Sequence, residues 1–141
     1  MEIKSVQDAA PAPSQPIIRW IRVLIAGFLA EVLLVGVAVP FYFLPDRQTA
    51  LNLAIPPASF LMFVGFGWWT ARGLPRSQVL NGFLAGLAGV LFYMILVLVA
   101  SVAAHRDPMT AMTPAYMLAH ALKLAGGAVG GWLAARGHSR G

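Results

Sequence analysis

The sequence has no cysteine and few charged residues, and both shortages narrow what the protein can be. Without cysteine the chain has neither a disulfide framework nor a thiolate metal site. Only 11% of its 141 residues are charged, whereas a soluble domain carries about a quarter. This shortage argues against a water-facing globular protein, and a hydrophobic fraction of 59% excludes disorder.

Acidic residues are scarcer than basic ones, five against ten, and the chain has a formal net charge of +5. A basic chain can bind nucleic acid when its Lys and Arg residues gather in a stripe. Here they lie beside the apolar segments, as positive charges at a membrane do. The sequence therefore predicts a lipid bilayer as the partner of this chain, and no nucleic acid.

Four apolar stretches are long enough to cross a membrane as helices. About 20 apolar residues span roughly 30 Å of hydrocarbon, and backbone groups in lipid must bond within their own segment, which favours helices. The predicted fold class is all-α, a bundle of four transmembrane helices within residues 17–137. The spans cover about residues 20–44, 50–71, 79–104 and 114–135.

The two ends of the chain differ from the spans. Residues 1–16 are polar and proline-rich, which predicts a flexible cytoplasmic tail, and residues 138–141 form a second, short one. A signal peptide would instead have an apolar region of about 7–15 residues. The first apolar run is longer and contains Glu31, so we interpret it as a retained span.

The distribution of Lys and Arg predicts the orientation. More of them lie on the side of both chain ends than on the other, and such residues favour the cytoplasm. We therefore expect both termini in the cytoplasm and the spans in a bacterial plasma (inner) membrane. Lys4, Arg19, Arg22, Arg72, Arg76, Arg136 and Arg140 lie on one side, and Arg47 and Arg106 on the other. Trp20, Trp68, Trp69 and Trp132 lie near the first side, as interfacial anchors do.

The two halves of the chain resemble each other, which predicts a tandem duplication of a helical hairpin. Gly-Phe-Leu-Ala occurs at residues 27–30 and again at residues 82–85. The second and fourth spans end in similar Trp…Ala-Arg-Gly segments, and each outer loop holds Asp and Arg before Thr-Ala. Such hairpins would be related by an axis along the membrane normal. Chance similarity is the alternative, because membrane segments use few residue types.

Glycines indicate where the helices touch, because glycine at four-residue spacing lets two helix backbones approach closely. Such contacts could hold a monomer together, or join the chain to a second copy or to another membrane protein, and the sequence leaves these alternatives open. The predicted packing positions are Gly27, Gly82, Gly86, Gly89, Gly127, Gly130 and Gly131.

Three ionisable residues inside the spans are the candidates for function. A charge at mid-bilayer costs about 3 kcal/mol on insertion scales, so it usually pairs or faces a cavity. With a rise of about 1.5 Å per residue, Glu31 and Lys123 reach similar depths near the midplane. We predict a Glu31–Lys123 pair between the first and fourth spans, with His120 one turn away on the same face. The pair can fix helix register or form a proton or cation site; an arrangement facing water without direct contact is the third alternative.

The remaining polar residues predict little chemistry. Asn52 and Asn81 lie at span ends, where we expect them to face lipid head groups. His105 and Asp107 share an outer loop and are too few for a metal site. The sequence contains no nucleophile motif and no phosphate-binding glycine loop, so we expect no enzyme, no cofactor and no metal.

Two family resemblances follow. The four spans, with glycine-rich hairpins ending in Trp-x-Ala-Arg or similar, look like many small uncharacterised bacterial inner-membrane proteins; this covers most of the chain and implies no activity. Residues 27–32, Gly-Phe-Leu-Ala-Glu-Val, are similar to the first helix of the small multidrug resistance transporters. Those are four-helix dimers whose membrane glutamate alternately binds protons and cationic drugs, which implies Glu31 as the coupling acid. His120, Lys123 and the proline-rich tail depart from that family.

Taken together, these patterns predict an integral membrane protein with a structural, assembly or accessory role, packed with itself or with a partner. The alternative is a small proton-coupled transporter or exporter that uses Glu31. The two differ in whether Glu31 faces a water-filled cavity or is closed off against Lys123.

Overall fold

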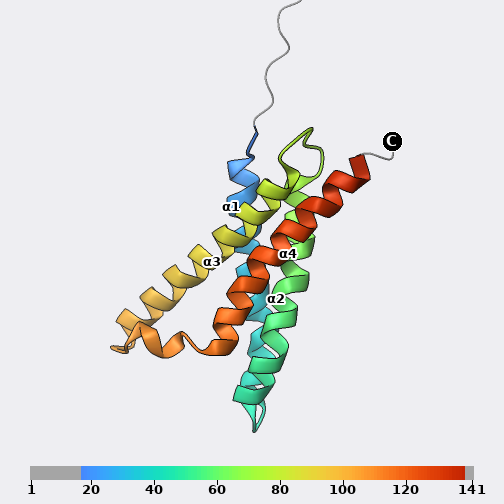
Figure 1. The fold of residues 1–141 in the computed structure, drawn as a ribbon. Coiled ribbons are helices and arrows are strands. Elements are labelled where there is room, and N and C mark those ends of the chain that lie inside the picture. The colour runs from blue at the N-terminus through green and yellow to red at the C-terminus, as the bar shows by residue number, and fades with distance from the viewer. Residues whose placement is uncertain (1–16, 139–141) are drawn as a thin grey trace, which may run out of the picture.

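A computed structural model describes residues 17–138, and this part of the chain is all-helical, as predicted (Figure 1). The predicted tail of residues 1–16 lies outside the described residues, as do residues 139–141 of the second tail. In chain order the helices are α1 (Trp20–Ala38), the 3-10 helix η1 (Val39–Phe43), α2 (Arg47–Ala71), α3 (Gln78–Ala103), the 3-10 helix η2 (Pro108–Ala111) and α4 (Pro114–His138).

Among the described residues, three helical segments are long and apolar enough to cross a membrane. They are Trp20–Phe43, which joins α1 and η1, Arg47–Ala71 and Gln78–Ala103. Helix α4 is as long as α2, at 25 residues, but it is less apolar because it contains several glycines, His120 and Lys123. The described chain is thus that of a membrane protein with three clear spans, and the fourth span stays a prediction.

Helix α3 diverges from α1 and α2 as it runs away from the α2–α3 loop (Figure 1). The start of α1, the α2–α3 loop and the end of α4 lie at one end of the bundle, which we call the terminal end; the other is the opposite end. Helix α4 packs between α2 and α3, whereas α1 packs on α2 and α3 and makes little direct backbone contact with α4. All buried residues of α3 lie in its first half, between Asn81 and Gly89. Helix α3 therefore packs closely on its neighbours only toward the terminal end. Helices α2 and α4 also have a buried cluster toward the opposite end, where Leu51, Ile55 and Ala119 pack with Ala38 and Phe41.

The predicted packing glycines lie at the closest contacts between helices. A Cβ added at Gly82 would collide with the backbone of Gly127, and one added at Gly127 would collide with Gly82, so α3 and α4 touch there through backbone atoms. At Gly27, an added Cβ would collide with Ala88 and Gly89, which joins α1 to α3. The other predicted positions also face atoms of a neighbouring helix; they are Gly86, Gly89, Gly130 and Gly131.

One prediction about the span ends is wrong, because Asn81 does not face lipid head groups. Its side chain is fully buried and forms hydrogen bonds across the terminal end. The amide nitrogen of Asn81 donates to the carbonyl oxygens of Ile17 and Ser77, each at 2.9 Å. Its carbonyl oxygen accepts from the backbone N–H of Arg19 at 2.9 Å. Asn81 therefore attaches the segment before α1 to the start of α3.

Candidate functional site

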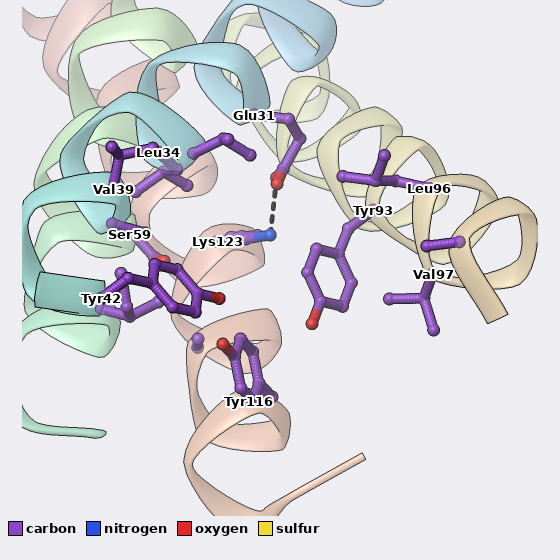
Figure 2. Close-up of a pocket in the computed structure, with 15 residues that line it drawn as sticks. Glu31, Leu34, Val39, Tyr42, Ser59, Tyr93, Leu96, Val97, Tyr116 and Lys123 are labelled. Carbon is purple, nitrogen blue, oxygen red and sulfur yellow. Dashed lines mark ion pairs between the residues drawn. The ribbon is translucent and has the colours of Figure 1, made fainter. Parts of the chain in front are cut away.

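Glu31 and Lys123 form an ion pair inside the bundle, as the sequence predicts (Figure 2). Lys123 Nζ lies 2.6 Å from Glu31 Oε1. Lys123 is 3% exposed and Glu31 is 6% exposed. The alternative in which the two groups have no direct contact is therefore wrong. A charge pair this well buried is stable only because each charge neutralises the other.

Helical spacing brings Glu31 to the interior. Gly27, Ala30, Glu31 and Leu34 are all buried on α1, and their spacing of three and four residues puts them on one face. Helices α1 and α4 make little backbone contact, so the pair is not a product of close helix packing. The side chains of Glu31 and Lys123 instead cross the space that separates the two helices.

Aromatic rings surround the ammonium group of Lys123. Its Nζ lies 4.8 Å from the ring centre of Tyr93 and 6.0 Å from that of Phe63. Both distances are within the range of cation–π attraction. Gly89 makes this arrangement possible, because a Cβ at that position would collide with the Phe63 ring and come within 3.1 Å of Glu31 Oε1.

His120 lies one turn from Lys123 but contacts a tyrosine ring. The His120 and Tyr93 ring centres are 4.7 Å apart in an edge-on arrangement. His120 is 8% exposed, and neither of its ring nitrogens has a hydrogen-bond partner among the described residues. His120, the predicted neighbour of the ion pair, thus packs against the ring of Tyr93.

A cavity of about 300 Å³ extends from the ion pair toward the opposite end. Most of its wall is apolar, from residues of α1, α2, α3 and α4. Ser59 lines it, is fully buried, and has a hydroxyl without a hydrogen-bond partner among the described residues. Glu31 Oε1 is in contact with the ammonium group of Lys123. Buried polar atoms without partners are uncommon in folded proteins, so the Ser59 hydroxyl marks a place where a ligand could bond.

The tyrosines of this cavity are functional candidates that were not predicted from the sequence. The chain has three, Tyr42, Tyr93 and Tyr116, and all of them line the cavity wall (Figure 2). The rings of Tyr93 and Tyr116 stack with centres 5.7 Å apart. A signal was present in the sequence, because every tyrosine lies away from the terminal end and every tryptophan lies near it.

Comparison of the chain with models of known families, with curated proteins and with solved structures finds no match. Within residues 17–138, no group of three His, Cys, Asp or Glu residues could hold a metal ion. The site itself offers one carboxylate, one ammonium group and several hydroxyl groups at the end of an apolar cavity. Such a site can bind a small molecule that has a polar head and an apolar body.

Proposed function

We propose that this protein is a small membrane carrier in which the Glu31–Lys123 pair binds the head group of an amphiphile. The observation that supports the proposal is the position of the pair, which is buried and yet forms part of a cavity wall. If the pair served packing alone, closely packed side chains around it would give a more stable protein, because a cavity in a core lowers stability.

The carrier would have four spans, with α4 as the fourth. Glu31 lies near the middle of the apolar segment Trp20–Phe43, and its partner Lys123 must reach the same depth. Helix α4 has 25 residues, about 37 Å of helix, which is enough to cross the hydrocarbon. Its lower apolarity fits its place between α2 and α3, where glycines meet neighbouring backbones and not lipid.

The terminal end would face the cytoplasm of a bacterium. The excess of Lys and Arg at this end supports the orientation. Arginines over tryptophan rings support the position of this end at a membrane interface, which both residue types favour. The guanidinium of Arg72 lies 5.3 Å from the Trp68 ring centre, and that of Arg136 lies 3.6 Å from that of Trp132. At the opposite end, Arg47 and Arg106 are accompanied by Asp46 and Asp107.

A duplicated hairpin also remains part of the proposal. Asp46 accepts a hydrogen bond from Thr49 N at the start of α2, and Asp107 accepts one from Met109 N at the start of η2. Each hairpin thus has an Asp-capped turn at the opposite end. The two hairpins differ in packing, since α3 and α4 pack much more closely than α1 and α2 do. On this proposal, the two copies diverged after the duplication.

Proton coupling would follow from competition at one carboxylate. Protonation of Glu31 would remove its charge and release Lys123, whose ammonium already faces the Tyr93 ring. A ligand head group would act on the same pair, so proton and ligand binding would influence each other. The other titratable groups along the cavity are Tyr42 and Tyr116.

A structural role is the second candidate, and the short distance within the pair favours it. At 2.6 Å the contact joins α1 to α4, two helices whose backbones make few contacts. In this case the protein would have an assembly or accessory role, packed with a second copy or a partner, and its cavity would bind nothing.

Filling the cavity distinguishes the two candidates. Val97 lines the cavity, whereas Val102 on the same helix is 68% exposed. Calorimetry on the protein in lipid nanodiscs would measure binding of dodecyl amphiphiles with cationic, zwitterionic and anionic heads, after subtraction of empty discs. We expect saturable binding of at least one probe, lost in Val97→Trp and kept in Val102→Trp.

The same titration, repeated in buffers of different ionisation heat, reports proton coupling. If ligand binding takes up or releases a proton, the buffer supplies or accepts it, and the measured heat varies with the buffer. That variation should disappear in Glu31→Gln. If none of the three probes binds saturably, the carrier proposal is wrong and the structural role remains.

A further inference from the structure

A second hollow meets the cavity at Glu31. It has a volume of about 440 Å³ and lies between α1 and α3, on the lipid-facing side of the bundle. Glu31, Val35 and Leu96 line both spaces, so the two adjoin each other. Lys123 lines only the inner cavity. Glu31 therefore borders both the inner cavity and the hollow between α1 and α3.

The divergence of two helices creates this opening. Helices α1 and α3 touch where Gly27 meets Ala88, and the rings of Phe28 and Phe92 contact each other next to it, with centres 5.6 Å apart. Beyond that point α3 has no buried residue. Its side chains there, such as Val99 at 61% exposed, face the space where lipid chains lie.

Where the cavity and the hollow adjoin, the negative charge of Glu31 and the positive charge of Lys123 neutralise each other. A monovalent cation bound to Glu31 would leave Lys123 without its partner in the membrane interior, and an anion bound to Lys123 would do the same to Glu31. An isolated charge at this depth is costly. A head group with one positive and one negative charge would satisfy both residues at once.

The surroundings also suit such a head group. Its cation would face Glu31 beside the ring of Tyr93, which lines the cavity and already faces an ammonium group. Its anion would face Lys123, with the Ser59 hydroxyl on the same cavity wall as a further donor.

We propose that the ligand is a zwitterionic amphiphile from the bilayer, with its head group at Glu31 and Lys123 and its chain between α1 and α3. This proposal rests on the proposed carrier function and adds the class of ligand and its route. It also differs from the resemblance to cation exporters, in which no lysine neutralises the membrane glutamate.

The test compares three probes with the same twelve-carbon chain, namely dodecylphosphocholine, dodecyltrimethylammonium and dodecyl sulfate. Their binding is measured by calorimetry on the full chain in phosphatidylglycerol nanodiscs, which hold no zwitterionic lipid and concentrate cations at their surface. We expect dodecylphosphocholine to bind at least tenfold more tightly than either charged probe.

The position of the chain is tested with Val99→Trp, which fills the hollow between α1 and α3, and with Leu53→Trp on the exposed face of α2 as control. Affinity for dodecylphosphocholine should fall at least tenfold in the first variant and stay unchanged in the second.

Equal or tighter binding of the cation or the anion would overturn the zwitterionic class and leave the carrier function standing. Unchanged affinity in Val99→Trp would overturn the route. Absence of saturable binding by all three probes would overturn the carrier function, and the ligand proposal with it.

Discussion

Asn81 shows how one polar residue organises the terminal end. It bonds to the segment before α1 and to the first turn of α3, while the Arg19 guanidinium donates to the carbonyl oxygens of Arg72 and Gly73. The chain entering α1 is thus attached to the α2–α3 loop. A sequence pattern places Asn81 near a span end but does not tell whether it faces head groups or protein.

Replacing Asn81 by Ala should destabilise the protein. The backbone N–H of Arg19 and the carbonyl of Ile17 would lose their hydrogen bonds to the buried Asn81 side chain, and each such bond contributes about 0.5–1.5 kcal/mol. Thermal unfolding in detergent would measure the loss. Asn52→Ala is the control, because Asn52 is exposed and bonds only to the Gln48 side chain among the described residues. Equal stability of the two variants would contradict this role.

The residues of the site were only partly predictable. The charges of Glu31 and Lys123 and their equal depths predict the pair, because isolated charges are costly in lipid. Ser59 and Tyr93 carry no such signal, since a hydroxyl can bond within its own helix or face the interface. Their place beside the pair depends on how the helices are arranged in space.

Among the helices, α4 makes the closest contacts. It packs on α2 through Gly67 and Gly127 and on α3 through Gly82 and Gly127, with backbone atoms in direct contact. The glycine spacing predicts such contacts, but it does not tell which helix is the partner. The structure shows that one glycine, Gly127, serves both.

A methyl group at Gly127 should force α4 away from its neighbours. The added Cβ of Gly127→Ala would meet the backbone at Gly82, which cannot move aside as a side chain can. Overpacking of this kind costs about 1–3 kcal/mol, measurable by denaturant unfolding in detergent. Gly65→Ala is the matched control, because nothing lies within 4 Å of its added Cβ, and it should leave stability equal or slightly higher. A Gly127→Ala variant as stable as this control would contradict the backbone contact.

At the scale of the whole molecule, α3 packs on its neighbours at the terminal end, and a cavity lies among the four helices toward the opposite end. The apolar runs predict helices and their lengths, because lipid demands both. They do not predict that α3 diverges from the bundle, since divergence is set by where close contacts stop and not by any local pattern. The cavity and its lipid-facing neighbour both result from that divergence.

The ion pair links α1 directly to α4, although the backbones of these two helices make few contacts. The most direct test is a double-mutant cycle of Glu31→Gln and Lys123→Met, with the free energy of unfolding measured in detergent. Each single variant should lose about 3–5 kcal/mol, because it leaves a buried charge without its partner. The double variant should lose about 2–3 kcal/mol less than the sum of the two single losses, which is the coupling energy of the pair. Additive losses, or a Lys123→Met variant as stable as the native protein, would show that the two charges do not interact.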